Sequence, residues 1–350
     1  MKAADRGRTQ GSPSLYLLIL AAAILLGLRV ALPAWIEHRI NGKSDDKGGY
    51  GWRVEDVDVR LLAGSYDLVG VSLRKRGLSR PLFTAERVTS KVNGLFKWPL
   101  TAHMESFGTR LDIDLDPAAK PKGAAPPRRP DWPKLLHRLT WFRVDRLTIR
   151  DGEIRFHDPE ARPPVELRAN DVDIEAWNLF RAGGDSSRST RLEAKGVLQG
   201  SGRFEFRTDL HSEAADPTFD VDFSVRGLEL KSMNPALEAY AGLSIVKGRL
   251  DLETRAKARG GGYKGVILSE LHDFEMKDAV EKPKGFVKAL ERKAARILGR
   301  ILENRTEENE AEGKGPPRAD FSGDFPAEVK GGWSRSEYLI KEAFRKGIIP

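Results

Sequence analysis

From about residue 50 onward, apolar and polar residues alternate in short runs that glycine, proline and charged residues separate. Alternation at every second position puts one set of side chains on each face of a β-strand. Runs of this kind are typical of antiparallel sheet with one buried face. The sequence therefore predicts a mainly β fold with a few short helices.

The apolar positions of these runs form one candidate face. The clearest alternation covers residues 219–225, FDVDFSV, in which every odd-numbered residue is apolar. Such side chains make either an ordinary sheet core or the lining of an apolar groove, and the pattern alone leaves both interpretations open. The candidate groove residues are Val69, Val71, Leu73, Ile154, Phe156, Val172, Ile174, Phe204, Phe206, Phe219, Val221, Phe223 and Val225.

Residues 15–36, LYLLILAAAILLGLRVALPAWI, differ from the rest of the chain because they are almost entirely apolar. We expect them to form a helix that crosses a membrane. The uninterrupted apolar run ends at Leu28 and spans roughly 21 Å of helix, less than the roughly 30 Å hydrocarbon core. Extension to Ile36 includes Arg29, whose long side chain can reach the interface from near the helix end. The candidate anchor residues are Leu15, Leu18, Ile19, Ile24, Leu28 and Trp35.

Basic residues before this segment set its expected orientation. Lys2, Arg6 and Arg8 outnumber the acidic residues there, so we expect a cytoplasmic N-terminus and export of the bulk of the chain. A cleaved signal peptide is the alternative. Its best cleavage position follows residues 32–34, Leu-Pro-Ala, where leucine stands in place of the expected small residue. We therefore favour a retained single-pass anchor.

Composition divides the chain into segments. Residues 117–130, PAAKPKGAAPPRRP, are typical of a disordered linker. Apolar positions over residues 284–303 predict an amphipathic helix that either covers the sheet or lies on a membrane surface. The expected order is 1–14 cytoplasmic tail, 15–36 membrane helix, 37–52 tether, 53–116 first β segment, 117–130 linker, 131–280 second β segment, and 281–350 helical and strand segment.

Turn signals mark three further points. Asp151-Gly152 lies between two alternating runs and predicts a β-hairpin. Asn234-Pro235 predicts the start of a short helix that Gly242 ends. The glycines at 260–262 predict another turn between strands.

Composition and charge narrow the choice of partners. The chain has 350 residues, a net charge of +8 and a pI near 9.5. A basic surface suits anionic lipid head groups or nucleic acid, and the expected export favours lipid, so we expect no nucleic-acid partner. The absence of cysteine excludes disulfides, thiolate zinc sites and cysteine nucleophiles.

The sequence predicts no catalytic, cofactor-binding or metal-binding residues, and no enzyme activity. We interpret His157-Asp158 and His272-Asp273 as chance neighbours at strand ends. Residues 112–116, DIDLD, suit the polar face of a strand better than a calcium loop, which needs glycine where Pro117 stands. GGGYKG at residues 260–265 is followed by a strand pattern, whereas a dinucleotide site needs a helix there.

The order of these elements resembles a known family. The anchor is followed by GWRVEDVDVRLLAGSYDLVGVSLRKR, then by VDRLTIRDGEIRFHDPEARPPVELRANDVDIEAWNL, then by a long alternating region. Over most of residues 30–350 this is similar to the AsmA-like proteins of Gram-negative envelopes, in a branch of unknown function related to AsmA and TamB. The resemblance implies an inner-membrane anchor and a periplasmic body built on a long, curved, taco-like antiparallel sheet with an apolar inner face. In larger relatives that sheet is implicated in moving phospholipid, and the family supplies no active-site residues.

Three functions are compatible with this pattern. The first is a non-enzymatic envelope protein that binds or conducts phospholipid acyl chains along an apolar β-groove in the periplasm. The second is a structural or assembly factor that contacts other envelope proteins through strand edges. An anchored enzyme ranks last, because the sequence lacks a catalytic constellation. Phospholipid that copurifies with the chain would separate the first function from the second.

Overall fold

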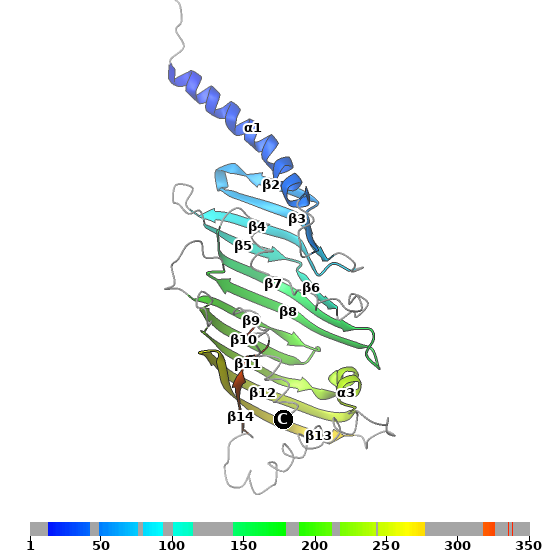
Figure 1. Cartoon of the computed structure of the whole chain (residues 1–350). Helices are drawn as coiled ribbons and strands as arrows, with labels where there is room; N and C mark the ends of the chain where they lie inside the picture. The colour runs from blue at the N-terminus through cyan, green and yellow to red at the C-terminus, as the bar shows by residue number, and fades with distance from the viewer. Residues whose placement is uncertain are drawn as a thin grey trace, which may run out of the picture.

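The computed structural model describes residues 13–42, 49–75, 80–93, 101–114, 143–179, 189–211, 218–242, 244–276 and 318–325, together with Arg335 and Tyr338. Fourteen strands within these residues form one large curved sheet, with a helix at one end (Figure 1). The mainly β fold expected from the alternation is therefore confirmed. The expected linker at 117–130 and the expected amphipathic helix at 284–303 lie outside the described residues.

The described elements follow the alternation of the sequence. The helices are α1 (Pro13–Gly42) and α3 (Asn234–Ala241). The first strands are β1 (Tyr50–Arg53), β2 (Asp56–Arg60), β3 (Ser65–Lys75), β4 (Phe83–Asn93), β5 (Thr101–Phe107) and β6 (Arg110–Asp114). The later strands are β7 (Arg143–Asp158), β8 (Val165–Trp177), β9 (Thr190–Leu198), β10 (Gly202–His211), β11 (Thr218–Glu229), β12 (Ile245–Arg259), β13 (Gly262–Met276) and β14 (Arg318–Asp324).

Strands that follow one another in the chain mostly lie side by side in the sheet. The order is β1-β3-β4-β5-β7-β8-β9-β10-β11-β12-β13-β14, with β2 paired to β3 and β6 paired to both β4 and β7. β5 and β6 run parallel to β7, and the other described pairs are antiparallel. This parallel junction joins the two expected β segments, 53–116 and 131–280, into one sheet.

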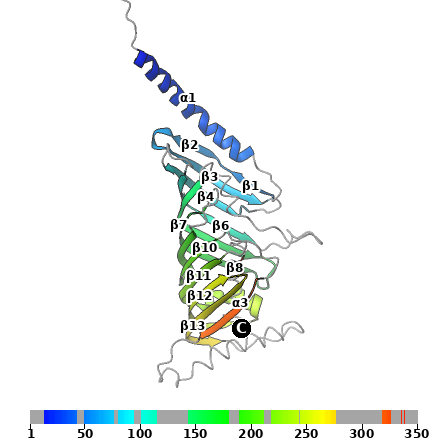
Figure 2. The ribbon, with the colours of Figure 1, turned by 60° about the vertical axis from the view of Figure 1, so that its left-hand side comes forward.

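Residues with left-handed backbone lie on many of the strands and bend them. At these points the burial pattern shifts by one position: on β3, Leu68 and Val71 are both buried although they are three positions apart. β7, β8, β11, β12 and β13 also carry register shifts or bulges. Because bulges bend and twist a strand, together they contribute to the curvature of the sheet, which Figure 2 shows. The left-handed residues within strands include Gly70, Asp151, Asp171, Gly227 and Asp273.

A bulge on β7 replaces the hairpin expected at Asp151-Gly152. β7 continues through this point, and the residues on both sides of it pair with β8. Asp151 has a φ of 51°, a left-handed value that also suits a hairpin turn. Here it is the one left-handed residue of a bulge, so the prediction of a hairpin was wrong.

The two other turn predictions are confirmed. β12 and β13 are joined through Gly260 and Gly261, both of which have positive φ. α3 begins at Asn234 and ends before Gly242, whose φ is 67°. The Asn234 side chain also bonds the amide and the carbonyl oxygen of Ile245, at 2.9 Å each, and so fixes α3 to the start of β12.

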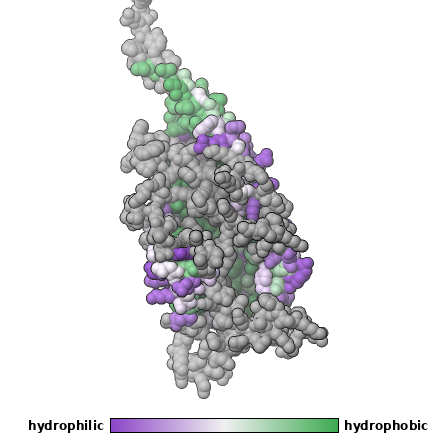
Figure 3. Space-filling model, in the orientation of Figure 1, coloured by the Kyte–Doolittle hydropathy of each residue, from purple (hydrophilic) through white to green (hydrophobic). Residues whose placement is uncertain are grey.

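Helix α1 has two parts with different surroundings. Towards its C-terminal end, Ile36 and Ile40 are buried against the sheet. The Asn41 side chain donates to the carbonyl oxygen of Val54 (3.0 Å) and accepts from the Val54 amide (2.8 Å), which ties α1 to the first strands. Further towards the N-terminus, apolar side chains are exposed, such as Leu26 at 65%. Figure 3 shows a hydrophobic, green surface on α1.

Within the described residues, no helix is both long and apolar enough to cross a membrane. The membrane-spanning helix expected over residues 15–36 is therefore not confirmed. The last turns of that segment contact protein: Arg29 donates to the carbonyl oxygen of Val59 at 3.5 Å, and Ile36 is buried. α1 also continues to Gly42, so a helix occupies the first part of the expected tether at 37–52.

Two apolar cores lie towards opposite ends of the sheet. The first gathers buried side chains of α1 and of the strands from β1 to β7, among them Leu68 and Leu73. The second gathers those of β10 to β14, among them Phe219, which is 0% exposed. Full burial of a large apolar side chain contributes about 1.5–3 kcal/mol. Each core therefore stabilises the strands at its own end of the sheet. We call the face that carries them the inner face.

Candidate functional site

The candidate groove residues fall into a buried and a half-buried group. The buried residues are Val71 and Leu73 in the first core, Phe219, Val221 and Val225 in the second, and Val172 on β8. The half-buried residues are Ile154, Phe156, Ile174, Phe204, Phe206 and Phe223. Val69 is half-buried as well but belongs to neither core, because the alternation on β3 breaks at the left-handed Gly70. Buried apolar residues therefore occur along the whole inner face, including Val172 on β8. Phe204, Phe206 and Phe223 pack against the second core and stay partly open.

Strand register brings the half-buried residues of five neighbouring strands into one line. Ile149 of β7 lies opposite Ile174 of β8, which lies opposite Ala194 of β9. Phe206 of β10 lies between Ala194 and Phe223 of β11, opposite both. We call these five residues the central row. Four strand spacings of about 4.8 Å give it a length of about 19 Å.

Side-chain size changes sharply beside the central row. A side-chain carbon added to Gly196 of β9 would lie 2.8 Å from the Phe204 ring, so this ring rests against bare backbone. Ala194, the neighbour of Phe206 across the same two strands, presents only a methyl group. The aromatic residues of β10 therefore lie opposite the smallest residues of the inner face, Gly196 and Ala194 of β9.

The candidate anchor residues all lie on α1. Leu15, Leu18 and Ile19 belong to its N-terminal part. Ile24, Leu28 and Trp35 are 54%, 42% and 51% exposed. The Arg39 guanidinium lies 5.6 Å from the centre of the Trp35 ring, a cation–π contact. Paired tryptophan and arginine side chains of this kind suit the boundary between lipid and water.

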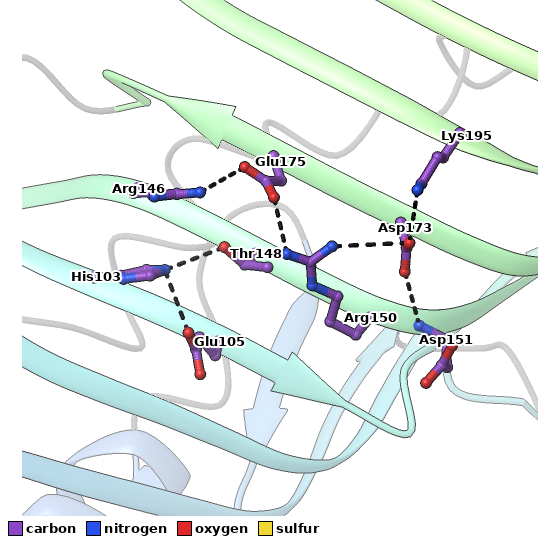
Figure 4. A network of polar contacts seen from close by, with 9 residues as sticks. All are labelled: His103, Glu105, Arg146, Thr148, Arg150, Asp151, Asp173, Glu175 and Lys195. Atoms are coloured by element: carbon purple, nitrogen blue, oxygen red, sulfur yellow. Dashed lines mark hydrogen bonds and ion pairs between the residues drawn. The ribbon is translucent and has the colours of Figure 1, made fainter.

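The opposite face of the sheet, which we call the outer face, carries charged residues in cross-strand pairs. Glu175 of β8 accepts hydrogen bonds from Arg146 (2.6 Å) and Arg150 (2.9 Å) of β7 (Figure 4). The bond from Arg146 holds the pKa of Glu175 below its ordinary value and keeps the carboxylate ionised. Asp173 lies 3.8 Å from Arg150 and 3.5 Å from Lys195 of β9, which extends the network to a third strand. Each such partly exposed pair adds little stability, but together they make this face hydrophilic.

Among the described residues, one cluster has the groups that ligate metals. Asp251 of β12 and Glu270 and His272 of β13 each offer one ligand atom, and these atoms lie within 4.8 Å of one another. The His272 Nε2 atom lies 3.5 Å from Asp251 and 3.7 Å from Glu270. The cluster is partly exposed, and exposed acidic groups often lie this close together without a bound metal.

Sequence reasoning missed this cluster because it compared His272 with Asp273, its neighbour in the chain. The register pairs Asp251 with Glu270 across β12 and β13, and it places His272 two positions from Glu270 on the same face. The turn at glycines 260–262 gives that register, because it joins the two strands directly. Pairing the residues of the two strands outward from this turn would have predicted that the three side chains lie close together.

In comparisons with known proteins, no protein-family model and no curated protein matches this chain. The resemblance to AsmA-like proteins therefore stays an expectation. Function has to be argued from the geometry of the two faces.

Proposed function

We propose that this chain is a non-enzymatic protein that binds phospholipid acyl chains along the inner face of its sheet. The observation that carries the proposal is the central row, a line of half-buried apolar side chains across five strands. Large apolar side chains partly in contact with water are unfavourable. An acyl chain supplies apolar contact along such a row without requiring hydrogen bonds from the protein.

Burial along β11 supports a binding region and a core on the same face. Phe219 is 0% exposed and packs in the second core. Phe223, four positions later on the same side of the strand, is only half-buried, as is Phe206 opposite it. The partly open section of β11 is thus the single position of Phe223, between the buried Val221 (3% exposed) and Val225 (2% exposed). The partly open section is where the proposal places the acyl chain.

The proposal includes attachment of the chain to the inner membrane through α1, with the N-terminus cytoplasmic and the sheet in the periplasm. Support comes from the exposed apolar side chains of α1, such as Leu17 at 66% and Leu20 at 57%. The bonds between Asn41 and Val54 tie that helix to the first strands, so the sheet would start at the bilayer surface. An acyl chain leaving the bilayer would then pass the first core before it reaches the central row.

Lipid analysis of the purified full-length chain tests this function. Phospholipid extracted from the wild-type protein and from two variants is quantified by mass spectrometry. Phe223→Asn places an amide in the central row. We expect about a tenfold loss of bound phospholipid, because the variant loses part of the transfer energy of one large apolar side chain, about 1.4 kcal/mol. Ser224→Asn adds the same group to the adjacent position on the outer face, and its bound phospholipid should equal that of the wild type.

A wild-type chain that carries no phospholipid would overturn the proposal, and so would equal phospholipid in the two variants. Absence of lipid would favour the second function, an assembly factor that binds other envelope proteins through strand edges. Among the described strands, β14 pairs only with β13 and so presents such an edge.

A further inference from the structure

Two arginines face each other directly on the outer face. Arg203 of β10 and Arg226 of β11 are cross-strand partners in the register of the sheet. Both side chains are exposed, and both line the same cavity. Like charges that lie directly opposite each other destabilise a strand pair. Such a pair therefore favours a bound counter-charge.

Neither arginine has an ion-pair partner among the described residues. Every other described arginine side chain on β7 to β13 pairs with a carboxylate, as Arg207 does with Glu193 and Arg255 with Glu253. Arg203 and Arg226 thus depart from the pattern of the face on which they lie. Their positive charges are left for a partner that is not part of the described sheet.

The cavity beside them has a volume of about 530 Å³ and is also lined by Arg249, Asp251 and His272. Of the three guanidinium groups in the lining, that of Arg249 is paired with Asp273 at 3.5 Å. Within the described residues, the unpaired positive charges are those of Arg203 and Arg226, and Asp251 supplies the one carboxylate of the lining. The carboxylate is already engaged: one Asp251 oxygen accepts from the Gly227 amide at 2.6 Å, and the other lies 3.5 Å from His272. The two unpaired arginines therefore leave the cavity with an excess of positive charge.

We propose that this cavity binds a phosphate group. Planar guanidinium groups match phosphate oxygens with paired, charge-assisted hydrogen bonds. A phosphate monoester carries close to two negative charges at neutral pH, which matches the two unpaired guanidinium groups. The volume accommodates the phosphate and part of the molecule that carries it. The group belongs either to a small phosphate compound or to a phospholipid head group, and the site lies on the face opposite the central row.

Titration of the full-length chain with inorganic phosphate, at constant ionic strength, tests the site. Calorimetry should give binding to the wild type that Arg203→Gln combined with Arg226→Gln weakens at least tenfold, about the effect of losing one or more charged hydrogen bonds. Arg207→Gln combined with Arg255→Gln removes equal charge from paired arginines of the same face. This control should bind phosphate within about twofold of the wild type.

The single variant Arg203→Glu provides a second test of the site in case a double variant folds poorly. The new carboxylate lies opposite Arg226, so this variant should melt at a higher temperature than the wild type and bind no phosphate. A wild type that shows no phosphate binding above that of chloride would overturn the proposal, as would equal losses in the double variant and its control.

Vesicles separate the two sources of the phosphate group. Flotation with phosphatidylcholine vesicles is compared with and without phosphatidic acid, which adds a phosphate monoester at the membrane surface. A gain with phosphatidic acid that Arg203→Gln combined with Arg226→Gln removes would assign the site to a lipid head group. A gain that this variant keeps, together with loss of inorganic phosphate binding, would assign it to a small phosphate compound.

Discussion

Phe219 and Phe223 offer a direct comparison between closed core and partly open inner face. They lie on the same side of β11, and truncation to alanine removes the same atoms from each. Phe219 is 0% exposed, its cross-strand partners Leu210 and Ala258 are 1% and 0% exposed, and the Phe325 ring centre is 6.0 Å away. Phe219→Ala therefore leaves a cavity.

The expected magnitudes follow from burial. A buried phenylalanine that becomes alanine costs about 3–5 kcal/mol, because both transfer energy and contacts around the cavity are lost. Phe223 is half-buried, so its truncation loses only part of the transfer energy, about 1–2 kcal/mol. Urea unfolding of the full-length chain, followed by tryptophan fluorescence, should give a difference of about 2 kcal/mol between the variants.

Added phospholipid extends the comparison. A ligand stabilises the native state in proportion to its affinity. Phospholipid should therefore raise the stability of the wild type and of Phe219→Ala by similar amounts, and that of Phe223→Ala by less. If Phe223→Ala costs as much as Phe219→Ala, and lipid has no selective effect, the whole inner face is closed core and the reasoning fails.

Two polar contacts give further predictions. Asn41→Ala removes both hydrogen bonds to the Val54 backbone, so we expect the free energy of unfolding to fall by about 1–3 kcal/mol. Protease should also cleave the full-length chain faster after α1. Unchanged cleavage would contradict the role of these bonds in fixing α1 to the sheet. Tyr240 donates to Asp158 at 2.8 Å, which lowers the pKa of Asp158, while burial raises the pKa of Tyr240 to about 12. Tyr240→Phe should therefore lower the melting temperature between about pH 5 and pH 9. The gap should close as the pH falls through the lowered pKa of Asp158 or rises from about 10 to 12, and a gap that stays constant at both extremes would contradict this bond.

Alternation predicted most of the strands because side-chain burial on a sheet repeats every second residue. It also grouped Phe204, Phe206, Phe219 and Phe223 on one face, as the register confirms. The pattern failed where a left-handed residue shifts the repeat, as at Gly70, and where Asp151 makes a bulge and not a turn. Turn and bulge use the same backbone conformation, so local sequence does not separate them.

Contacts between strands were harder to predict than the strands themselves. The parallel pairing of β5 and β6 with β7 depends on a connection whose length and path the alternation does not determine. The opposition of Arg203 and Arg226 depends on the register across β10 and β11, and residues 212–217 between these strands carry no alternation that determines it. Charge counting along the chain gave a basic protein, but it did not show which charges lack partners.

Site-specific photo-crosslinking in membranes tests the central claim most directly. A crosslinking amino acid is placed at Phe206, in the central row, and separately at Arg207, the next residue on the outer face. We expect phospholipid to be labelled from position 206 and not from position 207. Crosslinks from position 206 that reach only other parts of the same chain would show that the central row is covered by protein, and they would contradict lipid binding on the inner face.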